Sequence, residues 1–195
     1  MNPTAKVRLS PAEMRLVTDP EWILTKNSIM GKVVSLMAEQ SERYRPIWEN
    51  AVLPDGAHPS TPKISKGENY KGLPYVMLDY PRTFGREDIL AIRTLFWWGH
   101  TFSITLHLKG RYKELFLPVI QNRWKELAAA GFHIGISDDE WQHEHTPGNY
   151  RPMDSSLETG LAFLKLSASC GLDKWEEAPE ILLGWFGALV TALGR

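Results

Sequence analysis

The fold is decided by three successive runs of sequence: LPYVMLDY at residues 73–80, ILAIRTLFWW at 89–98 and TFSITLHLK at 101–109. These are the only long runs rich in β-branched and aromatic residues, and turn-forming residues separate them. We therefore predict three antiparallel strands. An edge strand at 63–66 and a short strand at 132–136 are expected to extend the sheet.

The remaining segments read as helices. Ser10 and Glu13 form a capping-box pattern before a first helix, and Asp19 is the expected N-cap of a second. The second helix should present one stripe to the core and end or kink at Pro46. That stripe consists of Trp22, Ile29, Met30, Val33, Met37 and Tyr44. Further helices are predicted at 111–130 with a kink near Pro118, at 157–171 with Leu157, Leu161, Leu164 and Ala168 on one stripe, and at 181–193.

The predicted fold class is α+β. We expect an antiparallel sheet of about four or five strands, with N- and C-terminal helices packed mainly on one face. A chain of 195 residues suits a single domain, and 43% hydrophobic residues are enough for a proper core.

The turn at Gly99 sets which side chains share a face of the sheet. A two-residue turn, Trp98-Gly99 or Gly99-His100, is favoured by the glycine. Either turn places Arg93, Leu95, Trp97, Phe102, Ile104 and Leu106 on one face, which we expect to be core. The other face would carry Ile92, Thr94, Phe96, Trp98, Thr101, Ser103, Thr105 and His107. A three-residue turn would exchange the faces of one strand.

The mixed second face has two interpretations. It is either a half-exposed sheet face, covered in part by a second layer, or a shallow ligand surface, because convergent polar groups on an apolar floor are typical of pockets. The candidate ligand-binding residues are Arg93, Phe96, Trp98, His100, Thr105 and His107.

The segment from Ser137 to Pro152 is dense in polar groups and contains a His143-x-His145 pair. In an extended chain these two imidazoles point the same way and could reach one metal ion. Glu140 is the candidate third ligand, with Asp138, Asp139 and Glu144 as alternatives and His100 approaching from the hairpin. Acidic loops also contain histidines that bind nothing, and we expect no cofactor.

Other charged groups have weaker patterns. Lys63, Lys66 and Lys71 lie among glycines in a loop-like region, where backbone amides and lysine can bind an anion. Asp79 and Arg93 are expected to form an ion pair near the sheet, and structural pairing is also expected for Arg82 and Arg86.

Composition excludes some partners and favours others. A net charge of −1 without a basic stripe argues against nucleic acid, and no apolar run is long enough to span a bilayer. A single cysteine, Cys170, placed by the helix prediction at a helix C-terminus, and an N-terminus without a signal-peptide core predict a cytoplasmic protein. The helix at 181–193 is apolar nearly all round, so we expect a twofold homodimer through it unless the N-terminal helix covers it.

From residue 75 to residue 172 the order of elements resembles the YktB-like family of uncharacterised bacterial proteins. The shared features are antiparallel apolar strands, a helix starting at Gly110-Arg111-Tyr112, an acidic tryptophan-containing segment and the ending Cys170-Gly171-Leu172. The resemblance implies an α+β fold and carries no activity. Two functions stay open: binding of a small ligand or protein partner through the mixed sheet face, or a metal-dependent hydrolase using His143 and His145.

Overall fold

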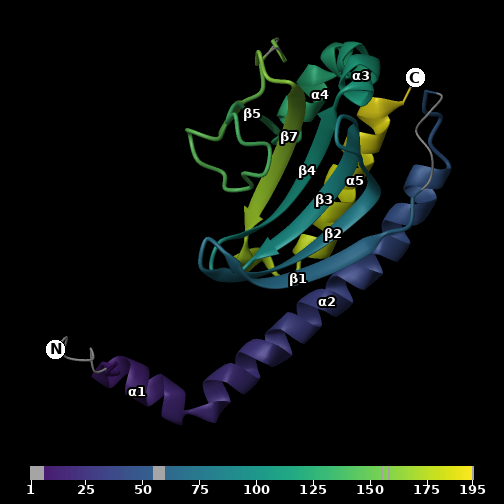
Figure 1. The fold of residues 1–195 in the computed structure, drawn as a ribbon. Coiled ribbons are helices and arrows are strands. Elements are labelled where there is room, and N and C mark those ends of the chain that lie inside the picture. Colours follow the sequence, from purple (N-terminus) through teal and green to yellow (C-terminus); the bar gives the residue numbers. More distant parts are fainter. Residues whose placement is uncertain (1–6, 55–59, 155, 158, 195) are drawn as a thin grey trace.

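The computed structural model describes residues 7–54, 60–154, 156–157 and 159–194. Within them, helices cover one face of a seven-stranded antiparallel sheet (Figure 1). The helices are α1 (Pro11–Thr18), α2 (Pro20–Glu49), α3 (Arg111–Asn122), α4 (Trp124–Ala129) and α5 (Ala178–Leu193), with a 3-10 turn, η1, at Leu172–Lys174. The strands are β1 (Lys63–Tyr70), β2 (Leu73–Phe84), β3 (Ile89–Trp97), β4 (Thr101–Lys109), β5 (His133–Gly135), β6 (Tyr150–Pro152) and β7 (Phe163–Gly171).

The strand order is β1-β2-β3-β4-β7-β5-β6. The first four strands follow one another as hairpins because each connection is short. The chain then leaves the sheet through α3 and α4 and returns to add the last three strands beside β4. The α+β class is confirmed, whereas the expected strand count of four or five is too low. The edge strand after residue 62 pairs with β2 as predicted.

The β3–β4 turn differs from the prediction and exchanges the faces of β3. Trp97 pairs with Thr101, so the connection has three residues, with Gly99 at φ +73°. Phe96 therefore lies opposite Phe102 and faces the helices, whereas Arg93 lies opposite Thr105 on the other face. The predicted facial assignment is wrong because one extra turn residue moves every side chain of a strand to the opposite face.

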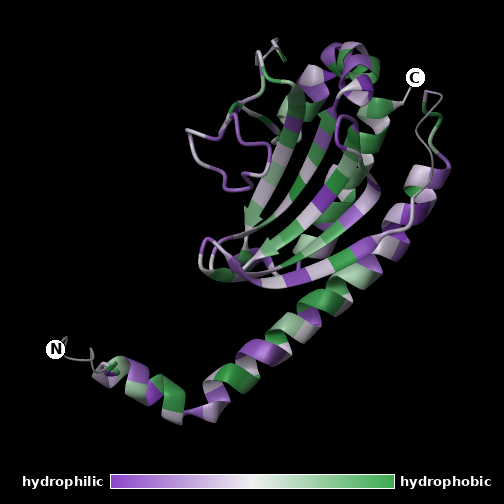
Figure 2. Cartoon of the chain, in the orientation of Figure 1, coloured by the Kyte–Doolittle hydropathy of each residue, from purple (hydrophilic) through white to green (hydrophobic). Residues whose placement is uncertain are grey.

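The helix-covered face holds the main core. In Figure 2, hydrophobic and hydrophilic residues alternate along the strands of the sheet. α2 and α5 lie side by side on the helix-covered face. The rings of Tyr44 and Phe186 stack at 3.9 Å, and the Tyr44 hydroxyl lies 3.3 Å from that of Thr94 on β3. Because α2 covers α5, no large apolar side chain of α5 is exposed. The expected open apolar surface on the last helix is therefore wrong.

The segment predicted as a helix at 157–171 contains the strand β7 instead. Leu164, Leu166 and Ala168 face the helices, and Lys165 and Ser167 alternate with them on the opposite face. The leucine spacing fits a helix, but period-2 alternation also runs from 163 to 170, and pairing with β4 decides between them. Cys170 accordingly lies on a strand, where burial raises the pKa of its thiol.

The N-terminal helices begin where the sequence predicts, but other predicted features of the helices are not observed. Ser10 and Glu13 form the predicted capping box, and the Asp19 side chain caps α2. Pro46 lies inside α2, which continues to Glu49. Trp22, expected in the core, is 51% exposed. The break in the helix after Arg111 comes at Arg123 rather than near Pro118. No helix among the described residues is long and apolar enough to cross a membrane.

Candidate functional site

The sheet face opposite the helices, called here the open face, carries the candidate site. An irregularity in β2 shapes it: Asp79 pairs with Arg93 but Arg82 pairs with Ala91, so two residues of β2 stand opposite Ile92 alone. A bulge of this kind changes the direction in which side chains point. As a result Asp79 and Arg82, three residues apart, both line the same cleft.

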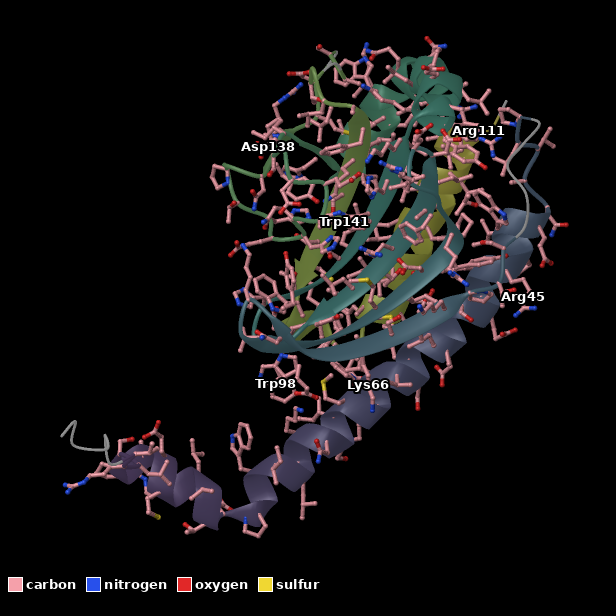
Figure 3. The ribbon with its side chains drawn as sticks, in the orientation of Figure 1. Arg45, Lys66, Trp98, Arg111, Asp138 and Trp141 are labelled. Atoms are coloured by element: carbon pink, nitrogen blue, oxygen red, sulfur yellow. The ribbon has the colours of Figure 1, made fainter. Side chains whose placement is uncertain are left out.

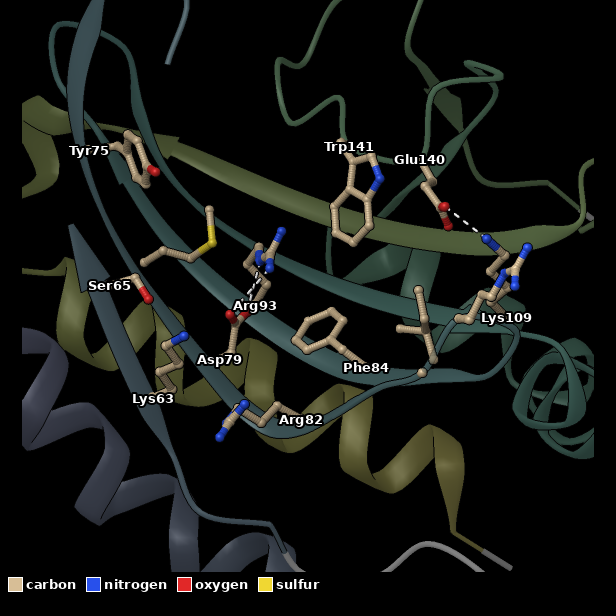
Figure 4. Close-up of a pocket in the computed structure, with 14 residues that line it drawn as sticks. Lys63, Ser65, Tyr75, Asp79, Arg82, Phe84, Arg93, Lys109, Glu140 and Trp141 are labelled. Carbon is tan, nitrogen blue, oxygen red and sulfur yellow. Dashed lines mark hydrogen bonds and ion pairs between the residues drawn. The ribbon is translucent and has the colours of Figure 1, made fainter. Parts of the chain in front are cut away.

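The cleft has a volume of about 600 Å³ and lies between β1, β2, β3 and the segment that follows β5 (Figure 4). Its lining residues are Lys63, Ser65, Tyr75, Met77, Asp79, Arg82, Phe84, Gly85, Arg86, Ile89, Arg93, Lys109, Glu140 and Trp141. The lining thus combines aromatic and thioether groups with charged groups.

The charges of the cleft do not balance. Five lining residues are cationic and two are acidic. Asp79 accepts two hydrogen bonds from Arg93, at 2.8 and 3.2 Å, so the predicted ion pair is confirmed. Glu140 accepts one from Lys109 at 2.8 Å. The other three cations, Lys63, Arg82 and Arg86, form no ion pair with any carboxylate of the described residues.

The segment from Ser137 to Asn149 lies over the open face; we call it the cover. Figure 3 shows Trp141 above the sheet and Asp138 further out on the same segment. The Trp141 ring lies 5.6 Å from the ring of His107, and the Arg93 guanidinium lies 5.7 Å from the Trp141 centroid. The Glu140 carboxylate lies 3.2 Å from His107 Nε2. The cover is therefore held to β3 and β4 by rings and charges.

His143, in the cover, reaches the sheet through Arg93. Its Nε2 lies 3.2 Å from Arg93 Nη1, and its backbone N–H donates to the Tyr70 hydroxyl at 2.9 Å. A guanidinium only donates hydrogen bonds, so Nε2 must accept and the ring proton resides on Nδ1. Nδ1 is buried and has no hydrogen-bond partner among the described residues. A small enclosed cavity lined by His143, Lys165 and Thr105 lies under the cover.

Burial lowers the pKa values of the ionisable groups under the cover. Burial, with the neighbouring charge of Lys165, lowers the pKa of His107 to about 4 and that of His143 well below its ordinary value. Burial and His133 lower the pKa of His145 to about 4. Burial, together with Arg93, lowers the pKa of Lys165 to about 7. These histidines are therefore neutral near neutral pH, and burial disfavours the ammonium form of Lys165.

Ser167 and His145 form a hydrogen-bonded pair at 2.8 Å, a spacing known from nucleophilic sites. Ser167 is 0% exposed, lies 2.7 Å from the Thr105 hydroxyl and donates to the Ile104 carbonyl at 3.0 Å. Its hydroxyl proton is thus already used, and the oxygen has no open approach. This pair fixes the cover to β4 and β7.

The predicted ligand-binding residues separate into two groups. Arg93, Thr105 and His107 come together on the open face, next to Lys165. Phe96 and Trp98 pack on the helix side, where the Phe96 ring also contacts Trp175, and His100 stacks on Trp97 at the hairpin turn. One flipped strand therefore divides the predicted set.

The predicted metal-binding residues have other partners. His143 contacts Arg93, His145 contacts Ser167, and Glu140 contacts Lys109 and His107. Within the described ranges, no group of three or more His, Cys, Asp and Glu side chains could hold a metal ion.

Lys165 is not among the predicted site residues, because the segment that contains it is predicted to be a helix. Its alternation with Leu164 and Leu166 is the sequence signal that indicates a place on the open face. Lys63, one of the three lysines considered for anion binding, lies on the predicted edge strand and lines the cleft. Lys71 pairs with Glu144 of the cover, and Lys66 faces α2 across the sheet from the cleft.

In comparisons with known proteins, no family model, no curated protein and no solved structure matches the chain. The resemblance to the YktB-like family stays a prediction. Fold and site together define an α+β protein whose sheet has one helix-covered face and one cleft-bearing face.

Proposed function

We propose that the protein binds a small anionic molecule in the cleft on the open face of its sheet. The observation that carries this proposal is the excess of three positive charges among the residues that line the cleft, five cationic against two acidic. The whole chain has a net charge of −1, so this excess is local. Fixed cations gathered in a cleft focus a positive potential and attract anions.

The size and the walls of the cleft support a small organic ligand. A volume of about 600 Å³ falls within the usual range for small-molecule sites. Phe84 and Trp141 flank the Arg93 guanidinium, whose carbon lies 5.4 and 5.7 Å from their ring centroids. An anion with a flat apolar part could place its charge beside Arg82 and Arg86 and its apolar part against these rings. Carboxylates and phosphates are the matching charged groups because arginine binds both in bidentate fashion.

The geometry favours binding over catalysis. Lys165, the group with the pKa best suited to act as a base, is 3% exposed and donates a hydrogen bond to the Gln142 carbonyl. The cavity beside it has room for about one water molecule, since its volume is only about 10 Å³. A substrate in the outer cleft could not reach Lys165 while the cover stays in place.

Titration calorimetry with phosphate, citrate and a nucleoside monophosphate tests the proposal. We expect at least one anion to bind, and Arg86→Gln and Lys63→Gln each to weaken binding by about 10-fold or more, as for the loss of one hydrogen bond to a charged group. Lys32→Gln, an exposed lysine on α2, is the matched control and should leave affinity unchanged. Absence of binding by all three anions, or equal loss in the control, would overturn the proposal.

A further inference from the structure

The buried stripe of α2 continues beyond the part of the helix that packs on the sheet. This stripe consists of the buried residues Met30, Val33, Met37 and Tyr44. Lys26 is the first buried residue of the helix. One turn earlier, Trp22 and Ile23 fall on the same side at helical spacing. They are nevertheless 51% and 42% exposed. The apolar stripe therefore runs past the edge of the domain, and none of the described residues covers it there.

Residues 7–25, which we call the arm, are all exposed. In Figure 1 the arm, formed by α1 and the first turns of α2, projects away from the sheet. Eight large apolar side chains of the arm are at least 42% exposed: Val7, Leu9, Met14, Leu16, Val17, Trp22, Ile23 and Leu24. An exposed apolar set of this size usually marks an interface.

The elbow between α1 and α2 forms an apolar groove of about 590 Å³. It is lined by Leu9, Glu13, Leu16, Val17, Asp19, Pro20, Trp22 and Ile23. The Ser10–Glu13 capping box and the Asp19 N-cap fix where both helices begin, so the sequence specifies this elbow. A helix of eight residues is marginal in water without packing, so α1 needs a partner surface to be stable.

We propose that the arm is a homodimer interface, in which the arms of two copies pack antiparallel about a twofold axis with their elbow grooves facing each other. Four helical segments would then enclose one apolar core, as in an antiparallel helix bundle. Every copy supplies the same surface, and such an isologous contact closes as a dimer.

The exposed area matches what a stable dimer needs. At roughly 100 Å² for a fully exposed large apolar side chain, the eight side chains would bury roughly 900 Å² over two copies. Apolar atoms make up about 60% of a typical interface, so the total would be about 1,500 Å², which is the standard size of a stable interface.

The charges of the arm also favour a second copy. The arm carries Arg8 and Arg15 against Glu13, Asp19 and Glu21. Antiparallel packing would bring Arg8, near the tip of one arm, toward the acidic elbow of the other. A helix that binds anionic membranes instead has a polar face rich in Lys and Arg, which this balanced set lacks.

Sedimentation velocity of the whole chain from about 10 to about 100 micromolar, above the weakest affinities typical of standard-size interfaces, tests the proposal. We expect a dimer of the 22.2 kDa chain, converted to a folded monomer by Trp22→Glu and by Leu16→Glu. Val52→Glu changes another apolar side chain, 73% exposed but outside the arm, and should stay dimeric. Circular dichroism confirms that each variant remains folded.

Amide exchange provides a second readout. Protection of the α1 amides should rise with protein concentration in the wild type and be lost in Trp22→Glu. A wild-type monomer would overturn the proposal, as would a dimer that survives both arm substitutions. Binding of the arm to lipid vesicles by a chain that stays monomeric would also overturn it, and would identify a membrane as the partner.

Discussion

The two faces of the same sheet are almost equally buried but chemically opposite. On β7, Leu166 is 0% exposed toward the helices and Lys165 is 3% exposed toward the cover. On β4, Leu106 and His107 differ in the same way, at 0% and 4%. The helix-covered face gains stability from apolar burial, whereas the open face holds ionisable groups away from water at a cost in stability. This difference in chemistry is the reason why the proposed binding site lies on the open face.

Leu106→Asp is the substitution that should show the largest difference in stability between the two faces. It places an unpaired charge in the helix-covered core and should prevent folding. His107→Gln, at the next position on the open face, keeps a polar group near Glu140 and should change the free energy of unfolding by about 1 kcal/mol or less at pH 7. Urea unfolding followed by circular dichroism measures both. Equal losses of the free energy of unfolding in the two variants would contradict the difference between the two faces.

Acid should destabilise the protein through the buried histidines. Their pKa values in the folded state, about 4 for His107 and His145, lie below the ordinary value near 6.5. Between these values the unfolded chain binds more protons, so stability is fully present above pH 6.5 and is lost as the pH falls toward 4. The loss should be of the order of 3 kcal/mol for the buried His107 and smaller for the half-buried His145. His107→Gln should flatten this slope in denaturant unfolding, and an unchanged slope would contradict the burial of His107 as a neutral ring.

Lys165 should make the free energy of unfolding depend on pH in a higher pH range than the histidines do. Its folded pKa of about 7 lies below the ordinary value near 10.4, so the unfolded chain holds the extra proton between the two values. Stability contributed by neutral Lys165 is therefore present above pH 10.4 and is lost as the pH falls toward 7. Lys165→Met should remove this slope and raise stability at pH 7 by about 2 kcal/mol, because similar shape is kept without the buried charge. A wild-type slope retained in Lys165→Met would assign it to other groups.

The smallest expected effect on stability concerns the rim of the cleft. Arg86 is exposed and forms no ion pair with a described carboxylate, so Arg86→Gln should change the free energy of unfolding by no more than about 0.5 kcal/mol. The same substitution is expected to weaken anion binding. Thermal unfolding with and without the bound anion measures both. A large loss of stability without ligand would make Arg86 structural.

Much of the fold could be predicted from sequence because local chemistry dictates it. Dense β-branched runs predicted β2 to β4, and the capping residues Ser10 and Asp19 predicted where α1 and α2 begin. The faces could not be assigned, since a turn of two or three residues at Gly99 is a small local choice that reverses a whole strand. Pairing with β4 overrode the helical spacing of leucines in β7.

The site was less predictable than the fold. Asp79 and Arg93 could be paired from sequence, but Lys63, Arg82 and Arg86 meet only because the bulge in β2 and the β1–β2 pairing bring them to one cleft. The cover has no periodicity that would reveal that His143 contacts Arg93. Such sites depend on tertiary placement, which composition and spacing do not encode.

The central claim is that the open face holds an unbalanced positive cluster that an anion neutralises. The most direct test is the affinity of phosphate, measured by titration calorimetry, in the wild type and in the double variant Lys63→Gln/Arg86→Gln, which removes two cations that line the cleft. The account predicts that the wild type binds the anion and that the double variant loses most of this affinity, because the positive excess of the cleft falls from three charges to one. An affinity that is the same in both proteins would contradict the account.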